Sequence, residues 1–144
     1  MAALTADRDT LELASSISQR HAQVGADSTQ FYKGGIVCLD QADGKMKKGA
    51  TATTLTAMGR CEENVLTGTS NTRKINCRSG IFKYGNSSAG DLLALTDVGK
   101  DCYLVDDQTV AKTNGSSTRS RAGKVDSIDA DGSVWVAFTF PLAT

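Results

Sequence analysis

Two adjacent aspartates, Asp106 and Asp107, could bind a cation or act as an acid and a base. They lie in the segment GKDCYLVDDQTVAKT, residues 99–113, between two runs rich in apolar and β-branched residues. Neighbouring side chains on an extended chain point to opposite sides, so the two carboxylates cannot easily converge on one atom. Aspartate is also common at the tips of tight turns. The pattern therefore favours a β-hairpin that turns at these residues over a reactive site.

The cysteines are the second set of candidate chemical groups: Cys38, Cys61, Cys77 and Cys102. No C-x-x-C pair is present, so the usual spacing of a structural zinc site is missing. A cysteine nucleophile needs a base beside it, and the only histidine, His21, lies in the polar segment SISQRHAQVG. The sequence predicts buried thiols, a surface histidine, and no catalytic residue, metal or cofactor. A small thiol-dependent enzyme or ligand-binding β-barrel that uses Cys77 or Cys102 with His21 is the alternative.

The charge balance gives no sign of a nucleic-acid or membrane-surface protein. The chain has 16 Lys and Arg residues against 16 Asp and Glu residues, a formal net charge of zero. It therefore lacks the positive field that nonspecific binding to nucleic acids or anionic membranes requires. A basic group on one expected strand, made of Arg73, Lys74, Arg78 and Lys83, is better explained as a solvated or partner-facing edge. We also find no signal peptide and no apolar span, which predicts synthesis in a cytoplasm.

The apolar pattern predicts one domain of short strands and tight turns. Apolar residues come in short alternating runs separated by Asp, Asn, Gly and Ser. Residues 36–39 form one such strand, which a turn at Asp43 and Gly44 connects to a return strand. Two more strands flank Asp131 and Gly132 near the end of the chain. One short helical turn is expected in LLALTDVGKD, residues 92–101.

Two further strands are predicted in the middle of the chain. TLTAMGRCEE, residues 54–63, alternates so that Leu55 and Cys61 share one face and Met58 lies on the other. TRKINCRSGIFKYG, residues 72–85, is the longest candidate strand. Gly80 in its middle predicts a bulge and a bend that let apolar residues on both sides of it face the core. The expected fold is thus mainly β, a small barrel or sandwich of short antiparallel strands and hairpins with at most one helical turn.

The opening residues differ from the rest. MAALTADRDT has no partner pattern of its own, and an end with little to bury is expected to be mobile. We therefore divide the chain into an extended arm, residues 1–15, and a single β domain, residues 16–144. Such an arm can join subunits by adding a strand to a neighbour's sheet edge. Its expected partner-binding residues are Leu4, Thr5, Asp7 and Arg8.

Several segments taken together resemble one family. ALTADRDT, FYKGGIVCLDQADG, SGIFKYGNSSAGD, DVGKDCYLVDDQTVAKT and TRSRAGKVDSIDADGSVWVAF follow one another along nearly the whole chain. In this order they resemble the capsid cement, or head decoration, proteins of tailed bacteriophages, particularly of Mu-like phages. The resemblance implies a mainly β structural protein, not an enzyme. It also implies that the 99–113 hairpin is a hallmark of the family, with Asp106 and Asp107 in its turn.

The same resemblance implies where the protein acts and what it contacts. Family members bind the outside of the icosahedral head, usually as trimers or other clusters at junctions between capsomers, and stabilise the shell. The expected partners are the major capsid protein and copies of the chain itself as a homotrimer, with no nucleic acid and no membrane. The protein would be made in the host bacterial cytoplasm and act on the outer surface of the virion capsid. A phage tail or fibre component is the alternative within structural proteins.

Overall fold

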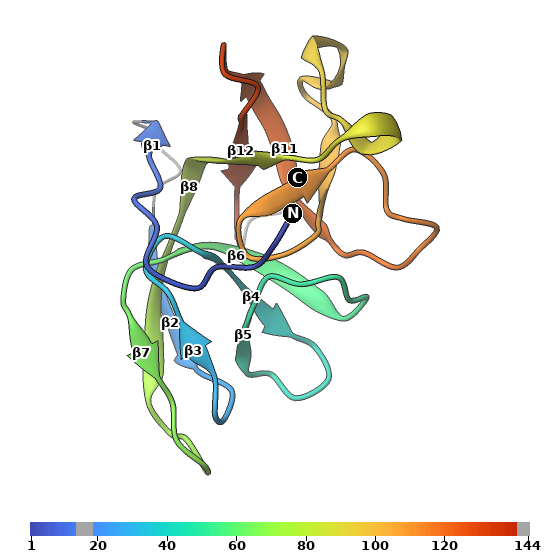
Figure 1. Cartoon of the computed structure of the whole chain (residues 1–144). Coiled ribbons are helices and arrows are strands. Elements are labelled where there is room, and N and C mark those ends of the chain that lie inside the picture. Colours follow the sequence, from blue (N-terminus) through green and yellow to red (C-terminus); the bar gives the residue numbers. More distant parts are fainter. Residues whose placement is uncertain (14–18, 141–144) are drawn as a thin grey trace.

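The protein is mainly β, as the sequence predicts (Figure 1). The computed structural model describes residues 1–13 and 19–140. The strands are β1 (Glu12–Leu13), β2 (Gln19–Val24), β3 (Gln30–Phe31), β4 (Ile36–Asp40), β5 (Met46–Lys48), β6 (Leu55–Cys61), β7 (Val65–Leu66), β8 (Lys74–Asn86), β9 (Asp101–Leu104), β10 (Thr109–Ala111), β11 (Arg121–Ile128) and β12 (Val134–Phe138). The predicted end of the arm, at residue 15, lies outside the described residues. No helix in the described ranges is long and apolar enough to cross a membrane.

Five of the strands close into a barrel. The second half of β8 pairs with β12, β12 pairs with β11, β11 with β9, and β9 with β10, all antiparallel. Strand β10 then returns to β8 in parallel, with Thr109 opposite Gly85 and Val110 opposite Asn86. The barrel encloses a buried core that includes Phe82, Tyr84, Cys102, Leu104, Val110, Val125, Val134, Val136 and Phe138. The predicted barrel of short antiparallel strands is confirmed.

A smaller lobe is built on the first half of β8. There β8 lies between β2 and β6. Strand β6 also pairs with β4, and β4 pairs with β5. A single bridge joins Gly25, just after β2, to Met46 in β5, and the short pair β3 and β7 lies alongside. This lobe has its own buried core: Phe31, Val37, Met46, Met58, Cys61, Val65, Ile75 and Cys77. The chain therefore has two cores, and strands β4, β6 and β8 contribute residues to both.

Gly80 is the point at which β8 passes from one core to the other. Before it, Ile75 and Cys77 are buried in the smaller lobe, and after it Phe82 and Tyr84 are buried in the barrel. The buried positions are odd before Gly80 and even after it, so the strand changes which side faces inward there. Its φ of +147° is a conformation that residues with a Cβ rarely adopt. Figure 1 shows β8 turning sharply along its length, and the predicted bend is confirmed.

The predicted alternation in β6 is wrong at Met58. Met58 is fully buried in the smaller lobe, although Leu55 and Cys61 are buried too. The reason is an irregularity in register, because Val37 pairs with Gly59 while the next residue, Cys38, pairs with Ala57. The extra residue on β6 shifts the alternation by one. A single-strand pattern could not show this, since the register depends on β4.

The 92–101 segment forms the predicted turn, and a second turn precedes it. The predicted turn is the 3-10 helix η2 (Leu95–Asp97), where the Asp97 carboxylate accepts a hydrogen bond from the Ala94 N–H at 2.9 Å. The other is η1 (Ala89–Asp91), so the described residues hold two short turns where the sequence predicts at most one. The three residues of η1 are not buried, so this turn has no apolar periodicity by which the sequence could predict it.

Asp40 predicts how stability responds to acid. Its carboxylate accepts hydrogen bonds from Lys47 Nζ at 2.6 Å and from the Ala42 N–H at 2.9 Å, which lower its pKa from 3.8 to about 2. A carboxyl whose pKa is lower in the folded state adds stability above its unfolded pKa, and this contribution is lost on acidification. We expect the melting temperature to fall between about pH 4 and about pH 2, and to fall less in Asp40→Asn. If the melting temperatures of the two proteins fell by the same amount over this pH range, this role of Asp40 would be contradicted.

Candidate functional site

The N-terminal arm lies against the chain's own barrel. The Leu4 N–H donates to Asp107 Oδ1 at 2.8 Å, and Gln108 Nε2 donates to the Ala2 carbonyl at 2.8 Å. The Leu4 side chain packs beside Gly35, because a Cβ on that glycine would lie 2.9 Å from Leu4 Cδ1. The turn of the 99–113 hairpin therefore holds the start of the arm. Three of the four predicted partner-binding residues, Leu4 among them, contact the same chain.

Arg8 holds the middle of the arm. Its guanidinium donates to Thr10 Oγ1 at 3.0 Å, to Gln108 Oε1 at 3.3 Å and to the Lys83 carbonyl at 3.0 Å. The same group lies over the Tyr84 ring, 5.4 Å from its centroid. The Arg8 N–H donates to the Lys33 carbonyl at 2.7 Å. Arg8 thus joins the arm to β8, to the hairpin turn and to the loop before β4.

Asp7 and Thr5 differ in what they contact. Asp7 Oδ1 accepts hydrogen bonds from the Lys33 N–H at 3.0 Å and from Asn64 Nδ2 at 2.7 Å. Thr5 is exposed, and so are the nearby residues Ala3 and Ala6. The arm therefore has an inner side that meets the barrel and an outer side that faces solvent.

A buried cluster of polar groups surrounds Thr10 of the arm. Thr10 Oγ1 and Tyr84 OH both donate to the Gly34 carbonyl, at 2.6 Å and 2.8 Å. Arg60 donates to the Thr10 carbonyl at 2.8 Å. A Cβ on Gly34 would lie 1.9 Å from the Arg8 carbonyl oxygen, so the loop can approach the arm this closely only with glycine. Thr10 is only 5% exposed, so the arm is buried at this point, although most of residues 1–9 are exposed.

The two aspartates of the hairpin have different roles. Asp106 Oδ1 accepts from the Gln108 N–H at 2.9 Å, the local contact expected of a turn. Asp107 is 1% exposed, and its carboxylate meets the Leu4 N–H and, at 4.0 Å, Lys48 Nζ. Burial raises the pKa of Asp107, although the Leu4 hydrogen bond and Lys48 oppose the shift. The predicted hairpin turn is confirmed, and the sequence did not reveal that Asp107 also holds the arm.

The cysteines are buried free thiols, as predicted. Burial raises the pKa of Cys61 to about 11 and those of Cys77 and Cys102 to about 12, so their thiolates are scarce at neutral pH. The register of β2 and β8 does place His21 opposite Cys77. The His21 ring is half-buried rather than at the surface, 5.2 Å from the Phe140 ring and 3.4 Å from Ser79 Oγ. The described contacts of its ring are thus with Phe140 and Ser79.

The basic side of β8 is matched by acidic neighbours. Arg78 Nε lies 3.3 Å from Glu62 Oε1, and Lys83 Nζ lies 2.6 Å and 3.0 Å from carboxylate oxygens of Asp129 and Asp131. Arg73, just before the strand, pairs with Glu63 at 2.9 Å. These pairs reduce the positive field along the strand, in line with a solvated edge.

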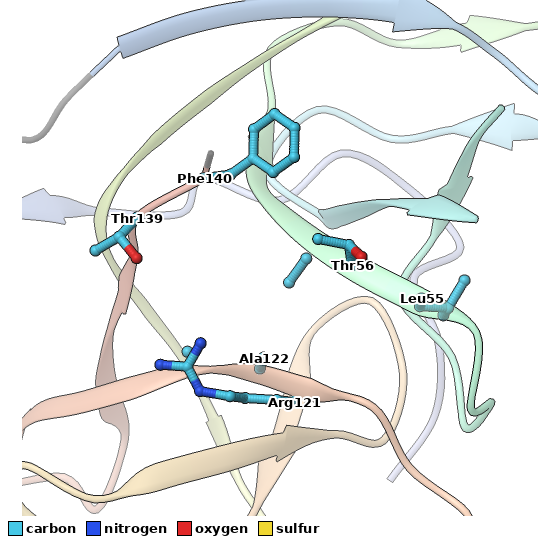
Figure 2. Close-up of a pocket in the computed structure, with 8 residues that line it drawn as sticks. Leu55, Thr56, Arg121, Ala122, Thr139 and Phe140 are labelled. Carbon is cyan, nitrogen blue, oxygen red and sulfur yellow. The ribbon is translucent and has the colours of Figure 1, made fainter. Parts of the chain in front are cut away.

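An open groove lies between β6, β11 and the end of β12 (Figure 2). Its volume is about 270 Å³, and it is lined by Leu55, Thr56, Ala57, Arg121, Ala122, Gly123, Thr139 and Phe140. Its one charged side chain, Arg121, donates from Nε to Asp101 Oδ1 at 2.8 Å. Within residues 1–13 and 19–140, no cluster of three or more His, Cys, Asp or Glu side chains could hold a metal ion.

Comparisons with models of known families, with curated proteins and with solved structures give no match. Function is therefore inferred from the sequence of this chain and from its own contacts. The arm combines long-range polar contacts to the barrel with an exposed outer side. We take the arm, with the hairpin turn that holds it, as the candidate functional site.

Proposed function

We propose that this protein is a structural component of a phage virion that binds the outer surface of the assembled capsid and stabilises it. Its partners are the major capsid protein and copies of itself in a homotrimer. The observation that carries the proposal is the arm: its inner side is fixed to the barrel, and its outer side is exposed. The order of family-like segments along the chain supports the same function.

The outer side of the arm is the proposed contact with neighbouring subunits. Ala3, Thr5, Ala6 and Asp9 are exposed, while Leu4 and Arg8 are half-buried against the barrel. A fixed segment loses less conformational entropy on binding than a mobile one, so an arm already held by its own barrel can bind a neighbour at lower cost. Docking by the arm thus depends on the intramolecular contacts of Leu4, Asp7 and Arg8.

A group of exposed apolar side chains supports a role in contacts between proteins. Leu92, Leu95 and Val98 are 48%, 75% and 45% exposed within one short segment. The arm begins close by, because Ser87, two residues before η1, donates to Met1 Sδ at 3.3 Å. Apolar groups gathered at one surface mark interaction sites more often than isolated ones do. We propose that this segment contacts the major capsid protein.

Stabilisation of the shell follows from where the copies bind. A protein that binds the assembled lattice and not its separated subunits shifts the equilibrium toward the intact particle. Many copies on one lattice increase the effect, since each contact made raises the local concentration for the next. No chemical reaction is required of the protein for this function.

The experiment mixes the purified protein with mature heads that lack it, sediments the heads and images the pelleted particles. We expect saturable, ordered added density from the native protein. Ala6→Lys places a charge on the exposed outer side of the arm and should reduce binding at least tenfold without lowering the melting temperature. Ala130→Lys makes the same change at an exposed position in the β11–β12 turn and is the matched control, with binding retained.

Each contrary result has a distinct meaning. If the native, folded protein does not bind heads, the capsid proposal is wrong, and binding to tails is tested next. If the native protein binds and Ala6→Lys binds equally well, the capsid proposal stands and the arm is not the contact. Rapid labelling of Cys77 or Cys102 by a thiol reagent at neutral pH would instead favour the thiol-dependent alternative.

A further inference from the structure

Cys61 and Cys77 lie directly opposite each other on the antiparallel strands β6 and β8. The backbone contacts identify the kind of pair that they form. The Cys61 N–H donates to the Gly35 carbonyl at 2.8 Å, and its carbonyl accepts from the Gly34 N–H at 2.9 Å, so both groups are engaged away from β8. The next pair along, Glu62 with Asn76, carries the β6–β8 hydrogen bond at 3.0 Å. Cys61 and Cys77 are therefore a non-hydrogen-bonded pair.

This geometry suits a bond between the two sulfurs. In a non-hydrogen-bonded antiparallel pair the Cα atoms are about 4.5 Å apart and the side chains lie on the same face. Disulfides span Cα separations of about 4.4 to 6.8 Å. Both side chains are in the core of the smaller lobe, 0% and 1% exposed. The other two cysteines lack such a partner, because Cys38 pairs with Ala57 and Cys102 with Gly123.

We propose that Cys61 and Cys77 are a redox site: hydrogen peroxide converts this pair of thiols to a disulfide that links β6 to β8. One sulfur attacks a peroxide oxygen, the O–O bond breaks, and a sulfenic acid and one water form. The second sulfur then attacks the sulfenic sulfur, the S–O bond breaks, and the S–S bond forms as another water leaves. In sum, two thiols and one hydrogen peroxide give one disulfide and two waters. This site goes beyond the proposed capsid function and does not depend on it.

The reduced pair is the state expected in a reducing cytoplasm. The Cys61 thiol lies 3.2 Å from the Glu63 carbonyl, which accepts its hydrogen bond. Burial raises the pKa of both thiols, so the folded protein reacts slowly and a small oxidant reaches the pair better than a bulky one. Once formed, the disulfide closes residues 62–76 into a covalent loop. This lowers the entropy of the unfolded chain and stabilises the smaller lobe.

The test exposes the full-length native protein to hydrogen peroxide, then unfolds it, blocks the free thiols and digests it with trypsin. Cleavage at Arg60, Arg73, Lys74 and Arg78 puts Cys61 in peptide 61–73 and Cys77 in peptide 75–78. We expect these two peptides to appear joined, and to separate on reduction. The oxidised protein should melt on the order of 10 °C higher than the reduced protein, and a dithiol reductant should reverse the shift.

Variants separate this pair from the other thiols. The double variant Cys38→Ala and Cys102→Ala should still give the joined peptides and the melting shift, whereas Cys61→Ala should give neither. The native protein alone decides the result if a variant fails to fold. Absence of joined peptides after peroxide treatment would overturn the proposal. The proposal would also be overturned if joined peptides that contain Cys38 or Cys102 appeared in the same amount as the joined Cys61 and Cys77 peptides.

Discussion

Replacing Gly59 with alanine should destabilise the protein by about 3 kcal/mol or more. Gly59 is in the irregular part of β6, with a φ of +142° that residues with a Cβ rarely adopt. A Cβ at this position would lie 2.0 Å from the Arg78 carbonyl oxygen, which is backbone of β8 and cannot move without shifting that strand. Alanine at this position would therefore cause both backbone strain in β6 and a steric clash with β8, at the junction of the two cores. The shift of the urea unfolding midpoint measures the loss.

Gly68 is the matched control for this substitution. A Cβ there meets nothing within 4 Å, and its φ is not in the positive range. Gly68→Ala should change stability by no more than about 0.5 kcal/mol. Equal midpoints for the two variants would show that β6 and β8 do not approach each other as closely as described.

The second large effect is expected from replacing Asp107, which should weaken the attachment of the arm to the barrel. Asp107→Ala removes the acceptor of the Leu4 N–H and the carboxylate beside Lys48. Loss of one such buried contact is worth about 1 to 3 kcal/mol, which corresponds to a release of the arm increased by roughly fivefold to a hundredfold. Trypsin cuts after Arg8 only when the arm leaves the barrel, so the rate of this cleavage under native conditions measures the release.

Asp106→Ala provides the comparison, because Asp106 accepts a hydrogen bond only within its own turn in the contacts described above. Cleavage after Arg8 should stay within about twofold of the native rate, since the change removes no direct contact with the arm. If both variants release the arm equally, the turn as a whole and not the Asp107 carboxylate holds it. Capsid binding by the Asp107 variant then tests whether a fixed arm is required for the proposed function.

The features that the sequence predicts correctly are those that depend on neighbouring residues. The 99–113 hairpin is set by β-branched runs around a turn, and the bend of β8 is set by Gly80 between two alternating patterns. Burial of the cysteines follows from their ordinary preference for the interior in the absence of a nearby base. In each case the signal lies within a dozen residues.

The features that the sequence does not predict depend on contacts between distant segments. Closure of the barrel uses only a short parallel pairing of β10 with β8, and the burial of Met58 depends on register with β4. The contact that holds the start of the arm is of this kind, since Leu4 and its acceptor Asp107 are 103 positions apart. Gly34 and Gly35 are the one local signal, since adjacent glycines mark places where two backbones approach closely.

The long strand β8 has a mechanical consequence. Its first half is hydrogen-bonded to β2 and β6, and its second half to β1, β10 and β12, so one continuous strand is bonded to neighbours of both cores. A force along the strand would load the hydrogen bonds of these five neighbours in shear at the same time, instead of opening them one after another. Because the backbone is continuous through Gly80, tension that reaches the barrel through the arm is shared with the smaller lobe. A protein exposed to internal pressure on a shell would gain resistance to rupture from this arrangement.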